Sequence, residues 1–224
     1  MSTLKLPLSG VDEADELLEN DALALLIGMV LDQQIPLERA FRSPFDLQQR
    51  LGKLDVVQLA EADPDELGGV FSQVPALHRF PGSMAKRVQE MCRHLIDVHD
   101  GSAAAVWESA TSGSELLANV KALPGFGEQK AKIFVAMLGK RLGVQPSGWR
   151  EAAGAFGEEG SFRSVADIDG PDALAQVRAY KQDMKAKAKA AAPAPPAGAK
   201  AKVAKAAKAT KSAKAAKAPR SAKK

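Results

Sequence analysis

Apolar residues recur at helical spacing along most of this chain, and this periodicity constrains the possible fold more than any other feature. The apolar side chains between Val88 and Leu95 follow the i, i+3, i+4 pattern of an amphipathic helix. The segment from Leu23 to Leu31 is apolar on nearly all sides, which indicates a buried helix. No segment shows convincing apolar–polar alternation bounded by turn signals. The sequence therefore predicts an all-α fold.

Capping residues, prolines and glycines set the boundaries of the expected helices. Asn20 or Asp21 is expected to cap the buried helix, and Asp63 to cap a helix that begins at Pro64. The expected helices cover 23–31, 44–51 (closed by Gly52), a segment from 64, 83–98, a short segment ending near 122, 128–142 and 171–184.

The composition changes abruptly after residue 184. Residues 185–224 hold 12 Lys and one Arg and no acidic residue, so this tail carries +13, while residues 1–184 carry −9. The tail lacks aromatic residues and has little apolar mass, so we expect it to be disordered, or helical once an anion neutralises its charge. We expect two parts: a folded domain over 1–184 and a polyanion-binding tail over 185–224, although a merely solubilising tail is the alternative.

Few residues are available for metal or disulfide chemistry. The chain has one cysteine, Cys92, and three histidines, so we expect no disulfide framework, no metal centre and no cofactor. Cys92 lies on the apolar stripe of its helix and is interpreted as a core thiol. The first residues lack the pattern of a signal peptide, and no run is apolar enough to span a bilayer. We expect a soluble, intracellular protein with no membrane partner.

A short turn between two expected helices carries the strongest motif. It consists of Leu123, Pro124, Gly125, Phe126 and Gly127. Two glycines separated by one apolar residue permit a tight hairpin with bare backbone amides, and the helix that follows adds its positive N-terminal end. Three lysines flank the turn at 121, 130 and 132. The pattern predicts a helix-hairpin-helix that binds a DNA phosphate, and an ordinary helical corner is the alternative.

With this hairpin, the chain resembles the helix-hairpin-helix DNA glycosylase superfamily (HhH-GPD), in particular its short base-excision-repair branch. Two further blocks resemble the family: Leu31-Asp32-Gln33-Gln34-Ile35, and the turn Pro81 to Lys86 before a helix. The resemblance covers roughly residues 20–145. It implies two helical lobes around a cleft, and an enzyme that flips a nucleotide out of duplex DNA and breaks its N-glycosidic bond.

The family's catalytic positions differ in this chain. The resemblance puts Gln129 where bifunctional members carry a nucleophilic lysine, which disfavours a lyase mechanism. It puts Ser147, Gly148 and Trp149 where an aspartate is expected. The nearest carboxylate is Glu151, which we take as the first candidate for the catalytic acid, and Asp32 is the second.

The remaining site residues are interpreted through the same resemblance. The expected DNA contacts are the five hairpin residues together with Gln33, Gln34, Lys86, Gln129, Lys130 and Lys132. The two glutamines contact bases, fill the gap left by an extruded base, or cap a helix end. Trp149 stacks on a base or packs in the core.

These observations favour a DNA-binding base-excision-repair protein. We expect a monofunctional DNA glycosylase that hydrolyses the N-glycosidic bond, and the alternative is a non-catalytic DNA-binding protein that retains the fold. The expected partner is double-stranded DNA, bound by a monomer through the hairpin and the tail, in the cytoplasm at the nucleoid. The sequence does not name the target base.

Overall fold

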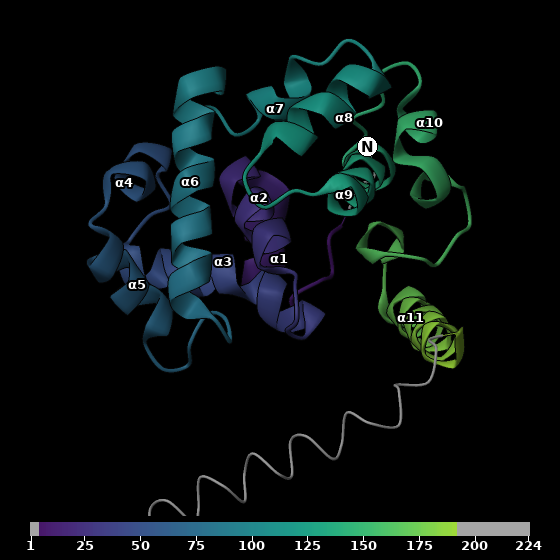
Figure 1. Cartoon of the computed structure of the whole chain (residues 1–224), viewed down its shortest axis with the longest axis horizontal. Helices are drawn as coiled ribbons and strands as arrows, with labels where there is room; N and C mark the ends of the chain where they lie inside the picture. Colours follow the sequence, from purple (N-terminus) through teal and green to yellow (C-terminus); the bar gives the residue numbers. More distant parts are fainter. Residues whose placement is uncertain (1–4, 192–224) are drawn as a thin grey trace, which may run out of the picture. The chain divides into compact units, whose positions relative to one another are not determined.

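The computed structural model describes residues 5–191, and over this range the protein is built from helices (Figure 1). The described residues form no strand, and only an isolated bridge joins Ser112 to Ser147. The α-helices are α1 (Asp12–Asn20), α2 (Ala22–Leu31), α3 (Leu37–Leu51), α4 (Val56–Glu61), α5 (Pro64–Ser72), α6 (Pro81–His99), α7 (Ala105–Glu108), α8 (Gly113–Ala122), α9 (Glu128–Arg141), α10 (Trp149–Ala153) and α11 (Pro171–Ala191), with 3₁₀ helices η1 (Gly154–Gly157) and η2 (Val165–Asp167). The predicted all-α fold is confirmed.

Local capping explains where several helices begin. The Asp21 carboxylate accepts hydrogen bonds from the amides of Leu23 and Ala24, so Asp21 caps α2. Asp63 does the same for α5, whose first residue is Pro64. Both caps were expected from the sequence, because a short acidic side chain before an apolar run satisfies amides that have no partner inside the helix.

Two predicted boundaries were wrong. Helix α3 begins at Leu37 rather than at Pro44, which lies inside it. The proline removes one backbone donor, but the buried side chains of Ala40, Phe41 and Leu47 on the same helix keep it in place against the core. Helix α11 continues to Ala191 instead of ending at residue 184. The alanines and lysines of this segment have high helix propensity, so the helix extends into the basic segment.

The chain divides into two units, Met1–Gln182 and Asp183–Lys224. In the first unit, α4, α5 and α6 pack together and α2 packs on α1, α3 and α6. A second group comprises α7, α8, α9, α10 and the two 3₁₀ helices. The second unit is described only over 183–191, so the expected behaviour of the rest of the tail lies outside the described residues.

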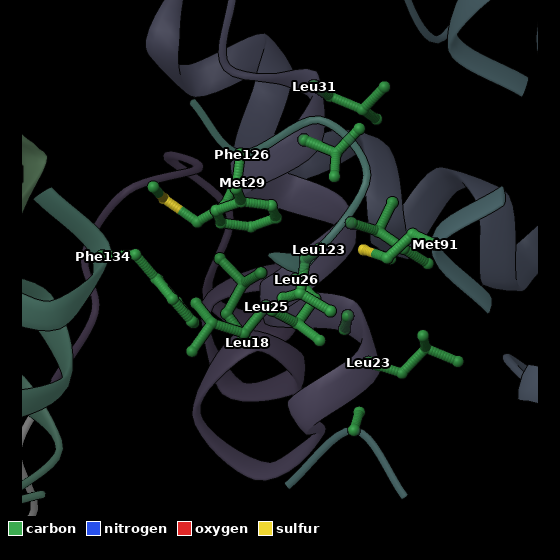
Figure 2. Packing of buried hydrophobic residues seen from close by; sticks show 14 of the residues in the cluster. Leu18, Leu23, Leu25, Leu26, Met29, Leu31, Met91, Leu123, Phe126 and Phe134 are labelled. Carbon is green, nitrogen blue, oxygen red and sulfur yellow. The ribbon is translucent and has the colours of Figure 1, made fainter. Parts of the chain in front are cut away.

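One continuous hydrophobic cluster joins the two groups of the first unit. Helix α2 is buried along its whole length after Ala22. Figure 2 shows Leu26 and Met29 of α2 close to Leu123 and Phe126 of the hairpin. The apolar hairpin residues therefore fix the α8–α9 turn to the central helix.

No helix among residues 5–191 combines the length and the apolar character needed to cross a membrane.

Cys92 is buried on α6, and burial raises the pKa of its thiol to about 12. This thiol is protonated at neutral pH, as expected of a core cysteine.

Candidate nucleic-acid interface

The hairpin between α8 and α9 has a buried side and an open side. Leu123 and Phe126 are buried, while Gly127 and Gln129 are exposed. The amide of Phe126 donates to the carbonyl of Leu123 at 3.1 Å and closes the turn. Gly125 has a φ of +96°, which a residue with a Cβ rarely adopts.

The open side presents backbone amides. No side chain caps the start of α9, and within the described part of the chain the amides of Gly127 and Glu128 donate to no protein acceptor. The positive end of the α9 dipole lies at the same place. This arrangement suits a phosphate group of a DNA backbone.

The lysines around the hairpin are less available than the sequence suggested. Glu128 forms ion pairs with Lys121 and, at 3.0 Å, with Lys132. Hydrogen bonds from these two lysines lower the pKa of Glu128. Their charges are therefore partly offset by a carboxylate of the first turn of α9.

Lys130 is turned toward the protein instead of toward solvent. Its ammonium nitrogen donates to the carbonyl oxygens of Met29 (2.6 Å) and Val30 (3.1 Å) at the C-terminal end of α2. Desolvation by burial lowers the pKa of Lys130 to about 8, against the attraction of Asp32 and with a further lowering from Arg87. Lys130 thus joins the hairpin to α2, so only its remaining N–H group is left for DNA.

Asp32 follows the last residue of α2, beside Lys130. Desolvation by burial raises the pKa of its carboxyl, and the positive charges of Lys181 on α11 and of Lys130 act against that rise. The carboxyl is therefore partly removed from water and lies in the field of two lysines. Such an environment is typical of carboxyl groups with a chemical role.

The two glutamines after Asp32 lie differently. Gln33 is half-buried and its amide nitrogen donates to the carbonyl of Val30 at 2.9 Å. Its amide oxygen accepts from Arg87 of α6 at 3.2 Å. Gln34 is exposed with a φ of +57°. The side chain of Gln33 closes the end of α2, while that of Gln34 is free to reach a ligand.

His78 fixes the backbone of this segment. Its Nδ1 lies 3.0 Å from the amide nitrogen of Phe80 and must accept that proton. The proton of the neutral ring is therefore on Nε2, which donates to the carbonyl of Gln33 at 2.8 Å. The loop before α6 and the glutamine segment are thus held together by one buried imidazole.

Glu151 and Trp149 lie away from the hairpin. Trp149 is buried against Gly139, where a Cβ would come within 2.3 Å of the indole ring. Gly139 is 12 residues after Gly127 on α9, which corresponds to about 18 Å along the helix axis. Glu151 is exposed and lines a surface pocket with Arg150, Glu158 and Glu159. The structure does not bring Glu151 to the hairpin, and it buries the ring of Trp149.

Lys86 is exposed on α6 and lies 3.8 Å from Glu90. It neighbours Arg87 in sequence but points to a different side of the helix, as successive residues must.

A cavity of about 530 Å³ lies between the two groups of helices, and Trp107, Glu108 and Leu25 are among the residues that line it. It opens beside Ala22, at the other end of α2 from Asp32, and none of the expected site residues lines it.

Comparison with protein families gives the decisive observation. The model of the HhH-GPD superfamily base excision DNA repair proteins matches residues 27–220. The chain belongs to this family. No curated protein and no solved structure matches the chain. As a member of the HhH-GPD superfamily, the protein is a DNA-binding base-excision-repair protein.

The HhH-GPD match covers the α2 end, the hairpin and the α6 turn together. The structure brings Asp32, Gln33 and Lys130 into one group with the hairpin. Arg87, His78 and Lys181 also belong to this group, and no sequence pattern marked them. Arg87 and His78 reach Gln33, and Lys181 acts on Asp32, only through tertiary packing of segments far apart in sequence. Among residues 5–191 no group of three or more His, Cys, Asp or Glu side chains could hold a metal ion.

Proposed function

We propose that this HhH-GPD protein is a monofunctional DNA glycosylase in which Asp32 supplies the carboxylate. The observation that supports this is the position of Asp32: a half-buried carboxyl in the field of Lys130 and Lys181, adjoining the phosphate-binding hairpin. Glu151, the other candidate, is exposed on α10, whose Trp149 packs against Gly139 near the end of α9 that is remote from the hairpin.

In the proposed reaction, the enzyme binds duplex DNA, and a nucleotide rotates out of the base stack. As the bond between the base and the sugar breaks, positive charge develops on the sugar ring. The Asp32 carboxylate stabilises that charge while the departing base keeps the electron pair of the broken bond. Water then adds to the sugar carbon, and the proton that it loses protonates the base. A base and an abasic site are the products, and the DNA strand remains intact.

Neither of the two positions after Glu128 supplies a free lysine amine that could replace water as the nucleophile. Gln129 occupies the position of the nucleophilic lysine in bifunctional HhH-GPD members, and it is exposed. The Lys130 amine is held by the two carbonyls at the end of α2. Under this proposal, borohydride reduction of a reaction mixture traps no protein–DNA adduct.

We further propose that the partner is double-stranded DNA bound by a monomer at the nucleoid. The hairpin amides hold one phosphate, and Gln34 and Lys86 are exposed for further contacts. The basic tail adds attraction that does not depend on sequence, because each neutralised phosphate releases counterions.

A second candidate is a non-catalytic DNA-binding protein that senses damage. The absence of an acid at 147–149 favours it. So does the raised pKa of Asp32, because burial disfavours the ionised form that the glycosylase reaction needs.

Base release from damaged duplexes distinguishes the two functions. The full-length protein is incubated with oxidised, deaminated, alkylated and mismatched duplexes, and alkali-labile sites are counted. We expect release from at least one substrate, loss of that release in Asp32→Asn, and retention in Glu151→Gln. Complete absence of release across the panel would establish the non-catalytic alternative.

The stability of Asp32→Asn is the control in this experiment. Because burial disfavours the charge of Asp32, an uncharged amide of the same shape should leave the unfolding temperature at pH 7 unchanged or higher. A variant that loses activity while keeping its stability has lost a chemical group and not its fold. Release that persists in Asp32→Asn would remove Asp32 from the mechanism.

A further inference from the structure

Arg87 is a half-buried cation on α6 without a carboxylate partner. Within the described part of the chain, its hydrogen bond is the one to the amide oxygen of Gln33, at 3.2 Å. A guanidinium has five N–H donors, so most of them have no protein acceptor. Buried charges are normally paired. An anionic ligand would therefore stabilise a half-buried arginine that has no carboxylate partner.

The stem of Arg87 lies against the hairpin. A Cβ placed on Gly125 would come within 2.9 Å of Cδ and 3.2 Å of Cγ of Arg87. The head of the same side chain reaches Gln33. Arg87 therefore spans from the phosphate-binding turn to the glutamine segment after α2.

The charges around this point do not balance. Arg87 and Lys130 are close enough for the positive charge of Arg87 to lower the pKa of Lys130. Lys181 is close enough to Asp32 to oppose the rise in the pKa of that carboxyl. Lys130 and Lys181 thus act on the one carboxylate of Asp32, and Arg87 adds a third positive charge near Lys130, in a folded part that carries −9 as a whole. A bound phosphate would offset this local surplus.

From these contacts we infer that Arg87 binds a second phosphate of the DNA backbone, outside the hairpin, and positions Gln33 against the same duplex. The inference rests on the proposed DNA binding by the hairpin. An arginine fork can bind a phosphate through two N–H groups while another N–H holds the Gln33 amide oxygen. Arg87 is thus a positioning residue that couples backbone binding to the glutamine segment.

The test measures how DNA affinity depends on salt for the full-length protein. Affinities for one duplex are determined between 50 and 200 mM salt for the wild type, Arg87→Gln, Arg87→Lys and Arg93→Gln. Arg93 lies on the same helix and its Nε donates to the carbonyl of Ala60, so Arg93→Gln matches the change in charge. Each lost phosphate contact should reduce the magnitude of the negative slope of log K against log salt by about 0.9.

We expect Arg87→Gln to make the negative slope shallower by about 0.9, the value for one phosphate contact. Arg93→Gln should leave the slope near the wild-type value. Arg87→Lys keeps the charge and should restore the slope. A double-mutant cycle with Gln33→Ala then tests the coupling: Arg87→Lys loses the fork, so Gln33→Ala should cost less affinity in that background than in the wild type.

Equal slopes for Arg87→Gln and Arg93→Gln would overturn the inference. So would additive effects of Arg87→Lys and Gln33→Ala. Failure of the proposed function is recognised separately, because replacing Gly127 with a bulkier residue would then leave DNA affinity unchanged. Thermal unfolding of each variant shows whether a loss of binding reflects a loss of fold, and Arg87→Lys carries the test if Arg87→Gln unfolds.

Discussion

Lys130 is a residue that the sequence assigns to DNA binding and that the structure ties to the end of α2. Its position after the hairpin suggested a DNA contact, but its amine closes the end of α2 through the carbonyls of Met29 and Val30. A neutral amine can make both hydrogen bonds, since each needs only one N–H group. Charge on this amine is therefore not required for its structural role.

Because Lys130 is buried, the folding stability of the protein should change with pH in the alkaline range. The pKa of Lys130 is lowered from the usual 10.5 to about 8 in the folded protein, so between these values the unfolded chain binds the additional proton. Stability should therefore rise as pH increases across this window, by at most about 3 kcal/mol. Denaturant unfolding at pH 7.5 and 10 measures the rise. Lys130→Met should lack this part of the rise, and an identical rise in that variant would contradict the assignment.

Glu128 is the second single residue with a large effect on the hairpin, because its carboxylate offsets positive charge on the hairpin surface. It neutralises Lys121 and Lys132 where the phosphate is proposed to bind. Glu128→Gln should tighten DNA binding severalfold and steepen the salt dependence by about 0.9 for each lysine that gains a phosphate. Glu115→Gln makes the same change in charge near the start of α8, where Glu115 accepts from Thr111. Comparable tightening in both variants would show a general charge effect only.

At the scale of elements, the two hairpin glycines have different physical reasons to be glycine. Gly125 combines a positive φ with the stem of Arg87 within 2.9 Å of a Cβ position. Gly127 has a φ of −80°, and nothing lies within 4 Å of a Cβ. The fold therefore requires the first glycine, whereas the second keeps the open side of the turn free for a ligand.

Alanine substitutions separate these two reasons. Gly125→Ala should destabilise the protein by about 1–2 kcal/mol, from backbone strain together with displacement of Arg87. Gly127→Ala should leave the unfolding temperature nearly unchanged and still weaken DNA binding. Thermal unfolding and DNA titration of both variants measure this. A loss of stability in Gly127→Ala larger than that in Gly125→Ala would reverse the assignment.

Whole elements also show where sequence patterns are sufficient. Caps, prolines and apolar spacing correctly placed α2, α5, α6 and α9 to within a few residues, because these signals act locally. The same local reasoning failed for α3, where burial holds a helix together across Pro44. It also missed α1, whose acidic surface hides an apolar side with Ala14 and Leu18 in the core.

For the whole molecule, the separation of charge implies different roles in DNA binding for its two parts. The basic tail attracts DNA, and the folded part positions it. The folded part carries −9 and the tail +13. Ending the chain after Ala191 removes nine lysines and Arg220. This truncation should weaken binding on every duplex sequence and flatten the salt dependence by about 0.9 for each lost contact. Unchanged salt dependence would exclude the tail from DNA binding, and the unfolding temperature is the control.

The sequence by itself determined the helical class, the hairpin and the resemblance to the HhH-GPD superfamily. These follow from periodicity, from glycine and proline chemistry and from a motif of five adjacent residues, all of which are local. From the sequence, Glu151 ranked before Asp32 as the candidate carboxylate, and the proposed function reverses that order. That choice depends on which residues become neighbours when α2, α6, α9 and α11 pack. Only the tertiary structure places Arg87 against Gly125 and Gln33, and Lys130 against the end of α2, because contacts between distant segments depend on the packing of the whole core.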